Sequence, residues 1–243
     1  MTREHKVVSH TEWIAARKQH LLREKEFTRL RDQLSRERRE LPWEAVEKEY
    51  VFDGPKGKET LSDLFEGRSQ LVIYHAMFDP ASASPATSWT ADAACNHCSL
   101  WADGFNGVIV HLNHRDVTML AVSRAPREKI LAYSKRMGWS FKWVSSGKTD
   151  FNSDYGVSFT AEEVALRKAD YNYTIQDPSQ TEREGLSVFY KDSAGQLFHT
   201  YSAYARGIDM VNLAYQYLDL VPKGRDEGKR GPHWVCRHDE YAK

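Results

Sequence analysis

Two cysteines separated by two residues, Cys95 and Cys98, have the clearest capacity for chemistry in this sequence. Their spacing suits a redox dithiol when the first cysteine lies at a helix N-terminus, because the free N–H groups and the helix dipole there stabilise a thiolate. The second sulfur, one turn later, can then close a disulfide with the first. Half of a zinc site has the same spacing, so the surrounding sequence must decide between the two chemistries.

In the redox interpretation, Cys95 is the exposed nucleophile and Cys98 is the buried resolving thiol. The attacking sulfur must be a thiolate, and a protonated His97 would favour that form of Cys95. The dipeptide Asn96-His97 resembles the histidine-bearing dipeptides of strongly oxidising disulfide donors, which indicates a less reducing potential.

In the metal interpretation, Cys95 and Cys98 supply two ligands, and Cys236 with His238 supplies two more. The spacing of Cys236 and His238 is tight for a zinc pair. We therefore expect no bound metal and no cofactor, and Cys236 is most simply a lone thiol.

The elements that must position the two cysteines alternate between strands and helices. Apolar runs predict the strands, and the first is apolar on both faces, as is typical of the centre of a sheet. Helical spacing of apolar residues predicts the helices, although Gly104 and Gly107 weaken the first one. In order, the sequence predicts a strand over 71–78, a loop over 79–94, a helix over 99–114, a strand over 117–122, a helix over 125–137 and a strand over 141–144. This alternation is typical of a parallel sheet with right-handed crossovers.

The remaining segments complete a three-part organisation. A capping box at Ser9 and Glu12 begins a long amphipathic helix that ends near Arg39, and a hairpin over 185–201 precedes a helix over 207–220. We predict an N-terminal helical arm over 1–46, a main domain over 47–221 and a charged C-terminal tail over 222–243.

Several segments carry a resemblance to a known family. They are Cys95–Asp103, Ala121–Pro126, Arg136–Trp139, Phe198–Gly207 and Arg237–Tyr241. The chain resembles the bacterial thioredoxin-like family of predicted dithiol-disulfide oxidoreductases, a domain of unknown function related to thioredoxins and peroxiredoxins. The resemblance implies an α/β fold of the thioredoxin-like class, with a central mixed sheet flanked by helices. It also implies that Cys95 and Cys98 exchange thiols and disulfides with a protein or a small molecule.

Two features depart from the wider thioredoxin pattern. A long loop over 79–94 separates the first strand from the cysteines, where thioredoxins have a short link. Gly185 stands just before the later strand, where thioredoxins place a cis-proline beside the dithiol.

Candidate substrate-binding residues lie outside the dithiol itself. Aromatic and charged side chains that could line a pocket for a small thiol or peroxide are Trp101, His199, Tyr201 and Arg206. The alternative for the aromatic segment around His199 is a role in the core and in hydrogen bonding.

Composition excludes several classes of function. Lys and Arg total 34, as do Asp and Glu, so no net charge would attract nucleic acid or an anionic membrane. No apolar run approaches the roughly 20 residues of a membrane span, and the charged N-terminus lacks the apolar core of a signal peptide. We therefore expect a cytoplasmic thiol-disulfide oxidoreductase that can form a homo-oligomer through its N-terminal helix. The alternative is a zinc-binding or redox-inactive interaction protein with the same fold.

Overall fold

The computed structural model describes residues 5–228 and 231–241 and divides the chain into two compact units. The first unit reaches Pro42 and consists mainly of α1 (His10–Arg39). The predicted capping box is confirmed, because the Glu12 N–H donates to Ser9 Oγ and the Ser9 N–H donates to Glu12 Oε2. Basic side chains in the last turn of α1 complement the helix dipole there.

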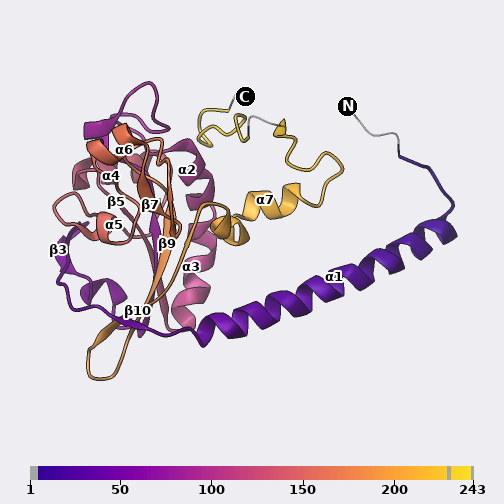
Figure 1. Cartoon of the computed structure of the whole chain (residues 1–243), viewed down its shortest axis with the longest axis horizontal. Helices are drawn as coiled ribbons and strands as arrows, with labels where there is room; N and C mark the ends of the chain where they lie inside the picture. Colours follow the sequence, from indigo (N-terminus) through magenta and orange to yellow (C-terminus); the bar gives the residue numbers. More distant parts are fainter. Residues whose placement is uncertain (1–4, 229–230, 242–243) are drawn as a thin grey trace. The chain divides into compact units, whose positions relative to one another are not determined.

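The second unit, from Trp43 onward, is built on a mixed sheet that has eight strands within the described part of the chain (Figure 1). From one edge to the other, the strands are β1 (Glu44–Ala45), β10 (Leu197–Tyr204), β9 (Gly185–Lys191), β4 (Gln70–His75), β5 (Val117–Ser123), β6 (Trp143–Ser145), β2 (Val51–Gly54) and β3 (Gly57–Thr60). Strands β4, β5 and β6 are parallel, whereas β9 is antiparallel to β4 and β10 is antiparallel to β9. Parallel strands on one side of β4 and an antiparallel hairpin on the other confirm the predicted thioredoxin-like class.

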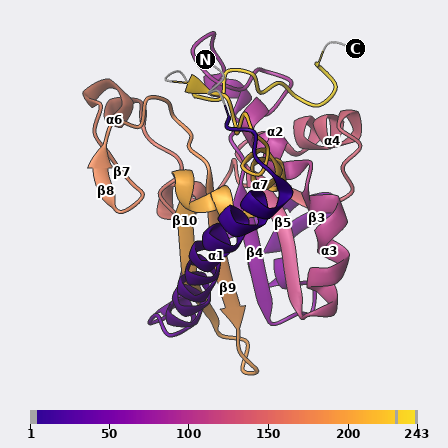
Figure 2. The same ribbon diagram turned by 90° about the vertical axis from the view of Figure 1, so that its right-hand side faces the viewer.

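Short helices connect the strands and cover the sheet (Figure 2). They are α2 (Asn96–Ala102), α3 (Phe105–His114), α4 (Arg127–Arg136), α5 (Phe151–Asp154), α6 (Ala161–Leu166), α7 (Leu213–Leu218) and the 3₁₀ helices η1 (Asp63–Phe65), η2 (Pro80–Ser82) and η3 (Ala205–Val211). A small hairpin of β7 (Ala169–Tyr171) and β8 (Thr174–Gln176) lies in a stretch for which the sequence predicted no strand. Within the described residues, no helix is long and apolar enough to cross a membrane.

The prediction of one continuous helix over 99–114 is wrong. The segment forms α2 and α3, which are separated at Gly104. A Cβ at Gly104 would lie 3.2 Å from Leu213 Cδ1, so α7 approaches the chain closely at this point. Glycine suits the break because it has low helix propensity and lets a neighbouring side chain approach. The predicted helix over 207–220 is likewise divided, into η3 and α7, and Asn212 caps α7 by accepting a hydrogen bond from the Tyr215 N–H.

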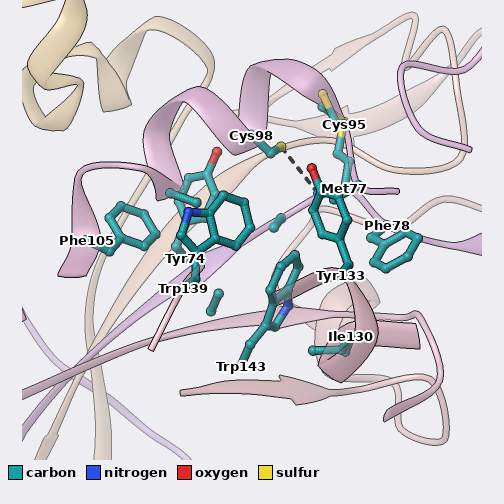
Figure 3. Close-up of a cluster of buried hydrophobic side chains, with 14 of the residues drawn as sticks. Tyr74, Met77, Phe78, Cys95, Cys98, Phe105, Ile130, Tyr133, Trp139 and Trp143 are labelled. Carbon is teal, nitrogen blue, oxygen red and sulfur yellow. Dashed lines mark hydrogen bonds between the residues drawn. The ribbon is translucent and has the colours of Figure 1, made fainter. Parts of the chain in front are cut away.

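The alternating side chains of β4 contribute to two different clusters of the core. Leu71 and Ile73 contribute to a cluster with Phe151 of α5, whereas Tyr74 contributes to a second cluster. The second cluster includes both Cys95 and Cys98 together with buried side chains from α2, α3 and α4 (Figure 3). The two cysteines are therefore part of the core that these three helices share.

The tight packing of Gly185 yields a stability prediction. A Cβ at this position would lie 2.9 Å from both Tyr204 Cδ1 and Val157 Cγ1, so Gly185→Ala should reduce the free energy of unfolding by about 1–3 kcal/mol. Gly107→Ala on α3 is the matched control, because its added Cβ meets nothing within 4 Å. There alanine should stabilise the helix by about 1 kcal/mol. Urea unfolding of both variants measures whether the two changes in the free energy of unfolding have opposite signs. Equal changes would contradict the close packing around Gly185.

Candidate active site

The backbone of Met77 holds both cysteines in place. The Cys95 N–H donates to the Met77 carbonyl at 2.9 Å, and the Met77 N–H donates to Cys98 Sγ at 3.4 Å (Figure 3). Cys95 is the N-cap residue of α2 and Cys98 lies in the first turn of that helix. Because Met77 lies only two residues beyond the end of β4, the sheet fixes the position of the pair.

Both cysteines are buried, with exposed fractions of 0% for Cys95 and 2% for Cys98. The prediction that Cys95 is exposed is therefore wrong. The physical reason is the C-terminal segment, defined here as residues 231–241, which lies over the start of α2. Arg237 donates two hydrogen bonds to the Ala94 carbonyl, from Nε at 3.0 Å and from Nη2 at 2.6 Å.

The pKa of Cys95 is well below its ordinary value despite complete burial. Burial by itself raises the pKa, but the polar side chains of Cys98, His97 and Ser88 near the sulfur outweigh this effect. His97 Nδ1 lies 3.9 Å from Cys95 Sγ, and its Nε2–H donates to the Pro232 carbonyl at 3.1 Å. The interaction with Cys95 in turn raises the pKa of His97, so a thiolate and an imidazolium stabilise each other.

The pKa of Cys98 is shifted in the opposite direction. Burial raises it most, and the neighbouring Cys95 and the charge of Glu184 raise it further. The Tyr74 hydroxyl, a polar donor group near Cys98, lowers this pKa and so counteracts these effects in part. This hydroxyl is buried and makes no hydrogen bond of ordinary geometry within the described residues.

A cavity of about 660 Å³ opens beside the pair. Its lining includes His97, Cys98, Trp101 and Arg206, which the sequence named as site residues, but not Cys95. Trp101 Nε1 donates to a backbone carbonyl of η3 at 3.3 Å. The Arg206 side chain is 83% exposed and forms an ion pair of 3.0 Å with Asp209.

A family model described as a bacterial protein of unknown function (DUF899) matches residues 2–241. The chain belongs to this family. None of the curated proteins matches the sequence significantly.

Solved structures similar to this member of the DUF899 family include two peroxiredoxins. Peroxidoxin BcpB from Mycobacterium tuberculosis is 12% identical, with a TM-score of 0.43 over 70% of this chain and 92% of that chain. Peroxiredoxin Q from Xanthomonas campestris is 15% identical, with a TM-score of 0.44 over 74% of this chain and 99% of that chain.

Two of the predicted substrate-binding residues do not lie at the dithiol cavity of this DUF899 protein. His199 lines a separate cavity of about 380 Å³, where its Nδ1–H donates to Glu44 at 3.3 Å and its Nε2 contacts Ser202 Oγ at 2.8 Å. Tyr201 packs against the edge of the buried cluster that contains the cysteines, and it is not among the described residues that line their cavity.

One of the predicted alternative zinc ligands, the His238 ring, has another partner. His238 Nδ1–H donates to Asp103 at 2.7 Å, and the backbone N–H of Cys236 donates to the Tyr241 hydroxyl at 3.2 Å. Across residues 5–228 and 231–241, no group of three or more His, Cys, Asp or Glu side chains is arranged to hold a metal ion.

The sequence did not identify four residues that shape the pair. They are Tyr74, Ser88, Glu184 and Arg237. Tyr74 lies on a predicted strand and Arg237 lies in a segment that carried the family resemblance. The sequence therefore singled out both segments but did not indicate that these side chains act on the cysteines. Ser88 and Glu184 stand in irregular loops, where no periodicity indicates the direction of a side chain.

A second buried titratable group lies in the loop before β9. Glu182 is almost fully buried, and it accepts hydrogen bonds from Ser158 Oγ at 2.7 Å and from Arg124 Nη1 at 3.4 Å. Burial raises the pKa of Glu182 to about 7, although Ser158 and Arg124 favour the charged form.

The opposite pKa shifts of the two cysteines predict that two substitutions act on different sulfurs. His97→Gln should raise the pKa of Cys95, because it removes the cation beside the thiolate. Tyr74→Phe should raise the pKa of Cys98, because it removes a hydrogen-bond donor. The ultraviolet absorbance of the thiolates against pH, in a Cys236→Ser background, measures both shifts. A His97→Gln protein with an unchanged Cys95 titration would contradict the proposed pairing.

The raised pKa of Glu182 predicts a pH-dependent loss of stability. Between about pH 4.5 and 7 the unfolded chain releases this proton while the folded chain retains it, so the free energy of unfolding falls as the pH rises. Relative to Glu182→Gln, the wild type should lose on the order of 3 kcal/mol across this interval. Urea unfolding at several pH values checks the slope. Glu162→Gln, at an exposed position of α6, should follow the wild type.

Proposed function

We propose that this protein is a thiol-disulfide oxidoreductase whose reactive pair is Cys95 and Cys98. The observation that carries the proposal is the divergence of two equally buried thiols, since the pKa of Cys95 is lowered and that of Cys98 is raised. Perturbed titratable groups beside a cavity are typical of functional sites. A pair of idle core cysteines would have no need of a cation beside one sulfur.

The proposed exchange moves two electrons between the pair and its substrate. When the pair is oxidised, a bond forms between Cys95 Sγ and Cys98 Sγ, and a disulfide RSSR leaves as two thiols that carry the two protons. In the other direction, two thiols leave as RSSR and the pair becomes reduced. Cys95 is the nucleophile of the exchange, and Cys98 is the sulfur with which it closes the protein disulfide.

The low pKa of Cys95 favours a particular direction. A stabilised thiolate lowers the free energy of the reduced pair, and this makes the protein disulfide more oxidising. The same direction is indicated by the Asn96-His97 dipeptide between the cysteines. We therefore propose that the oxidised protein accepts electrons from thiols.

Other expectations from the sequence stay predictions. They are a cytoplasmic location and a homo-oligomer formed through the apolar positions of α1.

Equilibration in glutathione buffers tests the proposal. The wild type and Cys236→Ser should show a two-electron transition to a Cys95–Cys98 disulfide, measured by alkylation and mass spectrometry. Neither Cys95→Ser nor Cys98→Ser should form an intramolecular disulfide under the same conditions. A pair that stays reduced at every glutathione ratio, or zinc that copurifies stoichiometrically with unreactive cysteines, would overturn the proposal.

A further inference from the structure

We propose that the substrate is a low-molecular-weight thiol that enters the 660 Å³ cavity and bonds to Cys98, while residues 231–241 keep larger thiols away from Cys95. This inference rests on the proposed function and specifies which sulfur meets the substrate and how large that substrate is. In this order Cys95 is the leaving thiolate when the pair oxidises thiols. In the reverse direction Cys95 is the attacking thiolate, and the sulfur it attacks belongs to Cys98.

The C-terminal segment closes the side of the pair that carries Cys95. Arg237 binds the Ala94 carbonyl immediately before this cysteine. Asn96 Nδ2 donates to the Val235 carbonyl, and Val235 itself is buried. The segment therefore contacts the residues on both sides of Cys95.

Further contacts fasten the end of the same segment to α2 and α4. Arg136 of α4 donates to Asp239 at 2.7 and 2.9 Å and to Glu240 at 2.8 Å. His238 donates to Asp103, the residue that ends α2. With anchors on two helices, the segment is held as part of the wall and does not lie loosely across the opening.

The cavity lies on the side of the pair that carries Cys98. Tyr74 and Trp101 line it together with Cys98, and Gly231 and Pro232 of the C-terminal segment form part of its wall. Its volume lies in the range of cavities that enclose small ligands, roughly 300–1,000 Å³, and a folded protein cannot enter it.

Charges of both signs line this cavity. Arg183 contributes positive charge, and Glu184 and Glu227 contribute negative charge. Arg225 also lines the cavity, where it is paired with Asp209 and Asp219. Such a lining suits a thiol that carries both a carboxylate and an ammonium group, because each charge finds its complement. We use glutathione as the probe of this class.

The first step begins when a substrate thiolate attacks Cys98 Sγ of the oxidised pair. A bond forms between the substrate sulfur and Cys98, the Cys95–Cys98 bond breaks, and Cys95 leaves as the thiolate with the electron pair. A second substrate thiolate then attacks the substrate sulfur of this mixed disulfide and forms RSSR. Cys98 leaves with the second electron pair and takes up a proton, so the protein disulfide is the oxidant of this half-reaction.

Leaving-group chemistry favours this order over attack on Cys95. A thiol of lower pKa leaves faster, and the lowered pKa belongs to Cys95. Attack on Cys95 in the first step would require the C-terminal segment to move aside and would expel Cys98 from the protein disulfide. In the proposed order Cys98, whose pKa is raised, leaves only in the second step, from the mixed disulfide. Access through the cavity and the better leaving group therefore both favour Cys98 as the sulfur that the first substrate thiolate attacks.

Rapid-quench mapping tests which sulfur the substrate meets. The oxidised Cys236→Ser protein is mixed with excess glutathione, quenched in acid and alkylated, and its peptides are identified by mass spectrometry. Early time points should show glutathione on Cys98 and an alkylated Cys95. Glutathione on Cys95 would overturn the inference and leave the proposed function intact, whereas failure to form the starting disulfide would overturn the proposed function itself.

A comparison of substrates tests the size limit. The oxidised wild type should react with glutathione at least tenfold faster per thiol than with reduced, unfolded ribonuclease A. Loss of the charged hydrogen bonds of Arg237 in Arg237→Gln should raise the rate with the protein thiol about tenfold or more and leave the glutathione rate within about twofold. Arg136→Gln provides a second variant that weakens the same docking.

Arg17→Gln on α1 is the matched control, because it removes an arginine that pairs with Glu24 and should alter neither rate. A wild type that oxidises the protein thiol as fast as glutathione would overturn the size limit. The same conclusion would follow if both docking variants fold and neither raises the rate with the protein thiol.

Discussion

Two hydrogen bonds to one residue hold the cysteine pair against the centre of the sheet. The Met77 carbonyl accepts from the Cys95 backbone, and the Met77 N–H donates to Cys98 Sγ. Met77 lies two residues beyond β4, whose Tyr74 is paired in register with Ala121 of β5 and with Leu186 of β9. Moving the cysteines would leave buried backbone groups unpaired, at a cost of about 1–3 kcal/mol each. The geometry of the pair therefore depends on the integrity of the mixed sheet.

Partners, and not burial, distinguish the two thiols. Both sulfurs are shielded from water to nearly the same extent, and burial alone would raise both pKa values. Cys95 has His97 beside it, whereas Cys98 is subject to the negative charge of Glu184. A donor from the core, Tyr74, moderates the second effect. A nearly symmetric pair thus acquires one thiol of lowered pKa and one of raised pKa, with His97 beside the first and the negative charge of Glu184 near the second.

Local sequence patterns were sufficient to predict most of the fold. The enclosure of the site instead depends on contacts between residues that are far apart in the sequence. Apolar runs identified the strands around the dithiol, because a central strand must be apolar on both faces. Gly104 was recognised as a weakness in the helix, but the approach of Leu213 that makes it a break comes from a distant segment. Arg237 and Ala94 are 143 residues apart in the sequence, and no periodicity connects them. A charged, glycine-rich tail has the composition of a solvated end, so its docking over Cys95 required the structure.

The long loop over 79–94, which departs from the thioredoxin pattern, encloses the pair from a second direction. Trp89 is buried and donates to the Asp79 carbonyl at 2.9 Å, so the loop has a packed interior of its own. Its Ser88 carbonyl accepts from the Asn96 N–H at 3.3 Å, and the Ser88 side chain helps to lower the pKa of Cys95. An ordinary dithiol site would leave the first cysteine open to large substrates. In this fold the loop and the C-terminal segment close that face, so enclosure and not the Cys-x-x-Cys spacing limits access to Cys95.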